Sequence, residues 1–296
     1  MNTEIKFDGE KFVGLVNGKV IVKSKSEYYV KRQLEGQKTA FRAAPAPVEC
    51  EFGINKRFQF LEQMVTMIAD GTMPSCVITG EGGLGKSYTV LKSLETAGLS
   101  NITDLANFQV GAKVNKSKSY KIIKGFSTAK GLYRTLFENN GMTIVFDDCD
   151  SILKDDVARN LLKGALDSYS KRYISWMADM RDDDLPKSFE FTGSIVFVSN
   201  MALDKIDQAI RTRSLVVDLT MTEEQKVERM VVIANSDEFL PEISPVAKSH
   251  ALAFLKANAG SIPNMSLRSL IAVTKIANTG NPQWKDLAKY VLTQGN

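Results

Sequence analysis

The eight-residue run GEGGLGKS combines glycines, a lysine and a serine in the spacing GxxxxGK[ST]. It lies between an apolar run, SCVIT, and a helical pattern, SYTVLKSLETAG. Such glycines let successive backbone N–H groups point at an anion, the lysine bridges the outer phosphates, and the serine hydroxyl ligates Mg²⁺. We therefore expect a nucleotide and its Mg²⁺ to be held by Gly80, Glu81, Gly82, Gly83, Leu84, Gly85, Lys86, Ser87 and the adjacent Tyr88.

A second apolar run, MTIVF, ends in two neighbouring acids, Asp147 and Asp148. Hydrolysis at a phosphate loop needs a carboxylate at the tip of a second buried strand to hold Mg²⁺, and often another acid to activate the attacking water. We assign the metal to Asp147 and the water to Asp148. Asp150 is interpreted as a helix cap without a chemical role. The alternative, a solvated cluster of acids at a strand end, is weakened by the phosphate-loop pattern upstream.

Three further residue types fit the same chemistry. Asn200 ends the apolar run GSIVFVSN, where an amide can reach the γ-phosphate and the water, although an Asn there is also a common turn residue. Arg213, and secondly Arg211, precede the run LVVDL and are interpreted as guanidinium groups aimed at a neighbouring subunit's γ-phosphate. Arg268 lies in the first turn of a predicted helix, where the dipole disfavours a cation, so we expect an external anion there.

The elements that must position these residues alternate along the chain. Apolar strand-like runs and amphipathic helical patterns alternate from about residue 48 to 220, which predicts an α/β domain with a parallel sheet covered by helices on both faces. Beyond this region the strand signal ends. Residues 221–296 are predicted to form a helical domain whose first helix opens with a capping box from Thr222 to Gln225, and whose later helices begin at Ser244-Pro245, at Ser266 and within PQWKDLAKYVLTQ.

The first 47 residues have a different pattern. Asn17-Gly18 lies between two alternating runs in FVGLVNGKVIVKS, which is a strong hairpin signal. The segment FRAAPAPVE contains Pro45 and Pro47 and favours an extended connector. We expect a small β ribbon and linker over residues 1–47, which is a candidate contact for a protein partner.

The ordered set of motifs resembles the AAA+ ATPases, over about residues 50 to 280. The likeness implies that residues 80–87 are Walker A, residues 144–148 Walker B, Asn200 sensor 1, AIRTRS an arginine finger and SLRSL a sensor 2 segment. It further implies a five-stranded sheet of order 5-1-4-3-2, a helical lid, and rings or spirals, commonly hexameric, that hold ATP and Mg²⁺ between subunits. The family usually has Asp-Glu in Walker B, so the shorter Asp148 implies slow or differently arranged hydrolysis. Superfamily 3 viral helicases, which are similar in Asp-Asp, ALD and the terminal Ser-Asn, generally lack such a lid, and an origin in a phage or mobile element fits this likeness.

The segment YSKRYISWMADMRDDDLPKSFEFT reads as a hairpin inserted before the sensor 1 strand. A hairpin at this point often faces the pore in AAA+ rings, which makes Lys171, Arg172, Tyr173, Trp176 and Lys187 candidate contacts for single-stranded nucleic acid. The alternative is an outer ribbon whose Trp176 packs on the core. A basic stretch before it has the same two interpretations, a solvated loop or a track for a phosphate backbone, and comprises Lys113, Lys116, Lys118, Lys121 and Lys124.

Composition limits the remaining possibilities. The 38 Lys and Arg against 34 Asp and Glu give a formal net charge of +4, which is compatible with nucleic acid. No apolar stretch approaches the roughly 18 to 20 residues of a membrane-spanning helix, and the start has no export signal, so we expect a cytoplasmic protein without a membrane partner. We expect an oligomeric ATPase that acts in a nucleic-acid transaction such as replication, unwinding or factor loading. A protein-remodelling ATPase is the main alternative, and an ATP-binding scaffold that hardly hydrolyses is a third.

Overall fold

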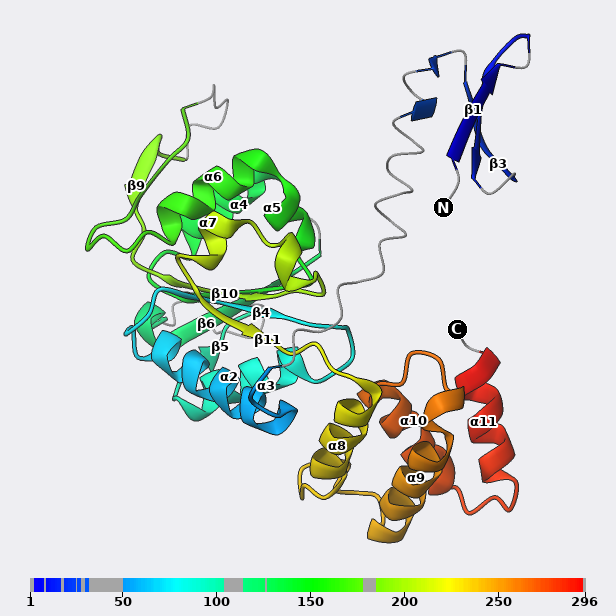
Figure 1. Ribbon diagram of the computed structural model, residues 1–296. Coiled ribbons are helices and arrows are strands. Elements are labelled where there is room, and N and C mark those ends of the chain that lie inside the picture. Colours follow the sequence, from blue (N-terminus) through cyan, green and yellow to red (C-terminus); the bar gives the residue numbers. More distant parts are fainter. Residues whose placement is uncertain are drawn as a thin grey trace. The chain divides into compact units, whose positions relative to one another are not determined.

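The computed structural model describes residues 3–7, 9–16, 19–24, 26–27, 30–31, 50–103, 114–125, 127–177 and 185–294. The chain divides into two compact units, Met1–Glu51 and Phe52–Asn296 (Figure 1). Each is considered by itself below. Among the described helices, none combines the length and the apolar character that crossing a bilayer requires.

The first unit contains a three-stranded antiparallel sheet of order β1-β2-β3. Its strands are β1 (Thr3–Phe7), β2 (Phe12–Val16) and β3 (Lys19–Ser24). Strands β2 and β3 flank the predicted turn at Asn17-Gly18, which itself lies outside the described residues, as does the predicted connector with Pro45 and Pro47. Val30 is buried against Ile5, Phe12 and Val22, so one side chain after the strands closes a very small core.

The second unit is built on a parallel sheet of six strands in the order β11-β4-β10-β7-β6-β5. The strands are β4 (Ser75–Thr79), β5 (Ser100–Asn101), β6 (Ser119–Lys124), β7 (Thr143–Asp147), β10 (Ser194–Val198) and β11 (Leu215–Asp218). The prediction of a parallel α/β sheet is confirmed, but the sheet has six strands where five were expected. The additional strand, β5, is only two residues long, too short for a recognisable sequence pattern.

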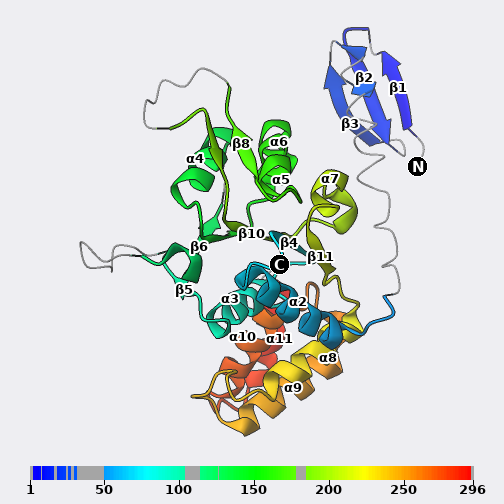
Figure 2. The same cartoon turned by 90° about the vertical axis from the view of Figure 1, so that its left-hand side faces the viewer.

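Helices cover both faces of this sheet (Figures 1 and 2). Alternate residues of a strand point to opposite faces, and in β4 Cys76 and Ile78 pack into one core cluster while Val77 packs into the other. The first cluster is closed by α2 (Ile54–Ala69) and α3 (Lys86–Thr96). The second is closed by α4 (Ala129–Glu138), α5 (Asp150–Lys154), α6 (Asp156–Ala165) and α7 (Gln208–Arg211). Burial on both faces explains why the central strands are continuously apolar.

After β11 the described chain is helical. The helices are α8 (Glu223–Ala234), α9 (Pro245–Asn258), α10 (Leu267–Ala277) and α11 (Trp284–Gln294). The predicted capping box at Thr222 and Gln225 is confirmed, and Ser244 caps α9 with Pro245 in its first turn. These helices share their own apolar core, which includes Met230, Leu255 and Leu270. They are called the lid below, and their separation from the sheet as a domain of residues 221–296 stays a prediction, since both belong to one compact unit.

The remaining elements are short. A two-stranded antiparallel hairpin, β8 (Tyr173–Ser175) and β9 (Ser188–Glu190), forms the inserted ribbon that the sequence predicts. Single-turn 3₁₀ helices occur at η2 (Lys116–Lys118), η3 (Leu203–Lys205) and η4 (Ala259–Ser261). The sole histidine of the chain, His250, is exposed on α9 and stacks on Trp284.

Candidate nucleotide site

The glycine-rich loop joins the end of β4 to the start of α3. Gly80 has a φ of 133°, and a Cβ at this residue would lie 2.9 Å from the carbonyl carbon of Leu219. Gly85 caps α3 in the left-handed conformation, with a φ of 88°. Both positions require glycine, because one has no room for a side chain and both have positive φ angles that other residues rarely adopt. The loop therefore ends by presenting the N-terminus of an eleven-residue helix, where backbone N–H groups attract anions.

Lys86 is buried and satisfied by three oxygen acceptors. Its Nζ donates to the carbonyls of Gly80 at 2.8 Å and Glu81 at 2.7 Å, and to Oδ1 of Asn200 at 3.0 Å. Burial lowers the pKa of Lys86, and the nearby carboxylates of Asp148 and Asp147 oppose that shift. The ammonium therefore lies folded against the loop, beside the helix N-terminus at which phosphates would bind.

The predicted metal ligands contact each other directly. Ser87 Oγ donates to Oδ1 of Asp147 at 2.7 Å, and Asp147, the last residue of β7, is buried. A hydroxyl and a carboxylate oxygen fit the preference of Mg²⁺ for oxygen ligands, of which substrate phosphates and water usually supply the rest. In the described parts of the chain, no group of three or more His, Cys, Asp or Glu side chains could hold a metal alone. The residues present thus fit a Mg²⁺ ion that binds together with a nucleotide.

Lys124 is a partner of Asp147 that the sequence interpretation placed elsewhere. It ends β6 directly opposite Asp147 in the strand register, and its Nζ lies 3.0 Å from Asp147 Oδ2. The exposed Lys124 side chain is thus paired with Asp147 at the sheet edge, and its role in tracking a phosphate backbone stays a prediction. The sequence signal for this ion pair was that Lys124 ends one predicted strand and Asp147 ends the next. Lys113, from the same stretch, lies outside the described residues.

Asp148 and Asn200 meet at the ends of adjacent strands. Asp148 is exposed and has a φ of 57°, a conformation that few residues other than glycine adopt but that Asp tolerates. Its Oδ1 accepts a hydrogen bond of 2.6 Å from Nδ2 of Asn200. The Asn200 amide thus joins the predicted water-activating acid to Lys86, and places both polar groups beside the loop.

Asp150 has a different role from the helix cap that was predicted. The N-cap of α5 is Cys149, and Asp150 is the first helical residue. Its Oδ1 accepts a 2.6 Å hydrogen bond from Oγ of Ser199, which precedes Asn200. This bond connects the start of α5 to the end of β10 and so helps to fix the position of Asn200. The Ser-Asn ending of the run GSIVFVSN was its only sequence signal.

Arg211 and Arg213 lie away from the loop of their own chain. The carbonyl of Arg213 accepts a hydrogen bond from Ser75, the first residue of β4, whereas the phosphate loop follows the last residue, Thr79. At about 3.3 Å per residue, this places them at opposite ends of the strand. Arg213 is half-buried and donates through Nη1 to the carbonyl of Ala209. Within the described structure, Nε of both arginines is buried without a hydrogen-bond partner.

Arg268, in contrast, lies next to the loop. A Cβ on Gly83 would be 3.7 Å from Arg268 Cδ, and the side chain of Arg268 is exposed. The N–H of the preceding residue, Leu267, donates to the Gly83 carbonyl at 2.9 Å. The structure therefore brings the first turn of α10 onto the glycine-rich loop.

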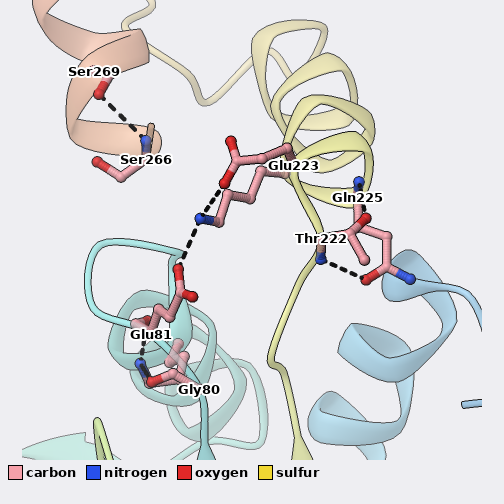
Figure 3. Close-up of polar contacts among 9 residues, drawn as sticks. Gly80, Glu81, Thr222, Glu223, Gln225, Ser266 and Ser269 are labelled. Atoms are coloured by element: carbon pink, nitrogen blue, oxygen red, sulfur yellow. Dashed lines mark hydrogen bonds and ion pairs between the residues drawn. The ribbon is translucent and has the colours of Figure 1, made fainter. Parts of the chain in front are cut away.

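Lys226 is a second lid residue at the loop, and the sequence interpretation missed it. Its Nζ lies 2.8 Å from Oε2 of Glu81 and 2.8 Å from Oε1 of Glu223. Figure 3 shows Glu81 on the loop and Glu223 on α8 facing each other across these two contacts. Burial opposes the charge, but the hydrogen bonds to Glu223 and Glu81 outweigh it and raise the pKa of Lys226. The Glu223 to Lys226 spacing is visible in the sequence, whereas the contact with Glu81 is not.

A pocket of about 780 Å³ adjoins the loop and extends between α2, α3 and the lid. Its lining includes Gly83, Gly85, Tyr88, Leu267 and Arg268. Tyr88, in the first turn of α3, donates through its hydroxyl to Oε2 of Glu238 at 3.0 Å, and Lys92 forms an ion pair with the same carboxylate. The volume falls within the range of about 300 to 1,000 Å³ typical of small-molecule sites.

The hairpin residues divide into two groups. Trp176 is half-buried against the core and contacts the Tyr133 ring, as the alternative interpretation expected, so we do not propose it for base stacking. The Arg172 guanidinium donates to the carbonyls of Ala165 and Gly193, which also removes it from the candidates for substrate contact. Lys171, Tyr173 and Lys187 are exposed, and the four acids between the two strands, Asp179, Asp182, Asp183 and Asp184, lie outside the described residues.

Comparison with known proteins gives one relevant likeness. No protein-family model matches the chain. The chain is similar, at 28% identity over 253 residues, to an uncharacterized 36.7 kDa protein from the nrdC-mobD intergenic region of Enterobacteria phage T4. The match covers 79% of this chain and 73% of the phage protein. Because that protein is uncharacterized, the likeness carries no activity over to this chain.

Proposed function

We propose that the chain is an ATP-hydrolysing member of the AAA+ class that works as an oligomer in a nucleic-acid transaction. The observation that carries this proposal is the convergence at one edge of the sheet of side chains from distant parts of the sequence. Lys86 and Asp148 both bond to Asn200, and Ser87 bonds to Asp147 beside them. A phosphate-binding lysine, an acid, an amide and a pair of metal-binding oxygens are the groups that phosphoryl transfer to water requires.

The strand order supports the assignment to this class. If β5 is left aside and β4 is counted as the first strand, the order β11-β4-β10-β7-β6 reads 5-1-4-3-2. The loop, the two acids and Asn200 then follow strands 1, 3 and 4, which are neighbours in the sheet. Parallel strands share one carboxyl edge, and ligands bind there in open α/β sheets.

The chemistry follows from these positions. The loop N–H groups and Lys86 would hold the phosphates, and Mg²⁺ on Ser87 and Asp147 would supply charge neutralisation. Asp148 would accept a proton from the attacking water. The oxygen of that water forms a bond to the γ-phosphorus while the bond from the phosphorus to the leaving ADP oxygen breaks. Asn200 would orient that water through the amide that already contacts Asp148.

The pocket beside the loop is the proposed place for the nucleotide base. It adjoins Gly83 and Gly85, and the lid side chains Leu267 and Ile271 contribute apolar surface to its lining. A flat base would pack on that surface, while Arg268 at the same end would face the phosphates. Lid and loop would thus both contact one ligand.

The position of the two arginines relative to the loop of their own chain supports an oligomer. Arg213 lies at the opposite end of β4 from the loop, so it cannot complete the site of its own chain. The proposal therefore assigns it, with Arg211 second, to the site of a neighbouring subunit. Nucleic acid is the favoured substrate because Lys171, Tyr173 and Lys187 are exposed on the β8–β9 hairpin, where a base can stack beside cations.

The test is the steady-state ATPase rate of the full chain with and without single-stranded DNA, at low and moderate salt. Lys86→Ala provides the blank, and Lys205→Ala, which alters an exposed lysine paired with Asp204, is the matched control. We expect Mg²⁺-dependent turnover in the parent and the control, and stimulation by DNA that fades with salt. Turnover that ignores DNA would reject the nucleic-acid substrate and favour a protein partner. Equal rates in the parent and Lys86→Ala would reject the ATPase itself.

A further inference from the structure

Lys226 is a buried charge that the proposed chemistry does not use. Four charged side chains are buried in the described structure, namely Arg57, Lys86, Asp147 and Lys226. Lys86 and Asp147 belong to the candidate site. Arg57 donates to the carbonyls of Asp218 and Thr220 and so fixes the connection from the sheet to the lid. Lys226 alone has no role assigned to it.

The position of Lys226 is stable only with its two acidic partners. Its side chain is 6% exposed, whereas those of Glu81 and Glu223 are 56% and 51% exposed. An ammonium removed from water is costly unless it is paired. Glu223 lies on the same helix, but Glu81 belongs to the glycine-rich loop, so the charge of a lid helix is compensated by the loop itself.

Glu81 is held from two directions. Its side chain pairs with Lys226, and its carbonyl accepts a hydrogen bond from Lys86. The lid also holds the loop at Gly83, through the N–H of Leu267. Because the directions of the loop's N–H groups determine how it receives an anion, the residues that fix Glu81 also fix the shape of the binding site.

We propose that Lys226 is a positioning residue that holds the loop in its phosphate-binding shape through Glu81, and so couples the lid to nucleotide binding. This inference rests on the proposed nucleotide site. Preorganisation lowers the entropic cost of ordering the loop when the ligand arrives. Loss of Lys226 should therefore weaken ATP binding more than it slows the chemical step, because Lys226 contacts the side chain of Glu81 and not the residues proposed to activate the water.

The test uses the full chain and three variants in a double-mutant cycle: Lys226→Met, Glu81→Gln and the two together. Methionine retains the apolar stem and removes the charge. Glu228→Ala is the matched control, because Glu228 lies on the same helix and accepts a hydrogen bond from Asn55 of α2, away from the loop. Lys226→Arg is the conservative variant that should restore function.

The first readout needs no nucleotide. Amide hydrogen exchange of residues 80–87 should be about tenfold faster in Lys226→Met and in Glu81→Gln, and unchanged in Glu228→Ala; tenfold corresponds to about 1.4 kcal/mol, close to the lower end of the range for a hydrogen bond to a charged group. The double variant should be no faster than either single variant, because both remove the same contact. Equal exchange in Lys226→Met and Glu228→Ala would overturn the proposal.

The second readout is ATP turnover. We expect KM for ATP to rise about tenfold in Lys226→Met with kcat within about twofold, and Lys226→Arg to recover most of the loss. A tenfold fall in kcat with unchanged KM would contradict a positioning role.

If Lys226→Met does not fold, Glu81→Gln decides the question, since Glu81 is exposed. If the parent chain turned over no ATP, the proposed function would fail, while hydrogen exchange would still decide whether Lys226 holds the loop.

Discussion

The carboxyl edge of the main sheet and the β8–β9 hairpin both carry polar and charged side chains, but they use them differently. At the sheet edge, Lys86, Asp148 and Asn200 come from three elements and bond to one another. On the hairpin, Arg172 is held by backbone carbonyls and Trp176 by core side chains, while Tyr173 faces solvent. The edge gathers its polar groups into one site, whereas the hairpin uses part of its set for attachment to the core.

The difference arises from how each region is constructed. Parallel strands end together, so the residues that follow them converge whatever their separation along the chain. A two-stranded ribbon is only marginally stable alone and must attach one face to a larger body. Its largest aromatic and its best hydrogen-bond donor are the natural attachment points, which leaves its smaller exposed residues for any ligand.

The largest expected effect follows from a substitution of Lys86, at the centre of the polar site at the sheet edge. Lys86→Ala should reduce ATP turnover by about a thousandfold, because it removes the charge nearest the phosphates and a partner of Asn200. Nucleotide binding, measured by titration calorimetry, should weaken in parallel. A variant that retained parental turnover would show that the edge is not an ATPase site.

In the hairpin, we expect the largest substitution to reduce the stability of the fold. Trp176→Ala should lower the free energy of unfolding by about 2 to 3 kcal/mol, somewhat less than the loss of a fully buried aromatic, because the ring is half-buried against Tyr133. Urea denaturation measures this change. Unchanged stability together with loss of DNA stimulation would return Trp176 to the substrate surface.

Tyr173→Ala sharpens the contrast within the hairpin. Stability should change by less than about 0.5 kcal/mol, as for other exposed positions. Affinity for single-stranded DNA, measured by fluorescence anisotropy, should fall about fivefold to tenfold if a base stacks on the ring. Equal DNA affinity in variant and parent would remove the hairpin from the substrate path.

The smallest expected effect concerns Lys124. Its ion pair with Asp147 competes with a metal for the same carboxylate, so Lys124→Ala should lower the Mg²⁺ concentration for half-maximal turnover by about twofold to fivefold. The change is modest because the lysine is exposed. A reduced salt dependence of DNA binding, with no change in the Mg²⁺ requirement, would instead indicate contact with a phosphate backbone.

The sequence predicts well what is local or follows from strand ends. The spacing around Lys86, the acids after MTIVF and the amide after GSIVFVSN each mark the end of an apolar run, and the parallel sheet then brings them together. Contacts that depend on register or packing are not visible in this way. The pairing of Lys124 with Asp147 requires the alignment of β6 on β7, and the pairing of Lys226 with Glu81 requires the lid to lie on the loop.

The hairpin is a second case in which side-chain packing could not be predicted from the sequence. Its two strands and their order are evident from RYISW and SFEFT, yet nothing in these runs tells which aromatic enters the core. Trp176 could be assigned only once Tyr133 and Phe189 were placed beside each other. The same segment therefore yields a confirmed element, while the role of its aromatic side chain depends on packing that the sequence does not show.

The most direct test of the central claim is a comparison of ATP binding and turnover in Asp148→Asn. If Asp148 activates the attacking water, the variant should bind ATP and Mg²⁺ as the parent does, yet its kcat should fall by about a hundredfold to a thousandfold. The control is Lys205→Ala, which should match the parent in both measurements. A kcat equal to that of the parent, with binding intact, would contradict the account and leave the chain as an ATP-binding scaffold.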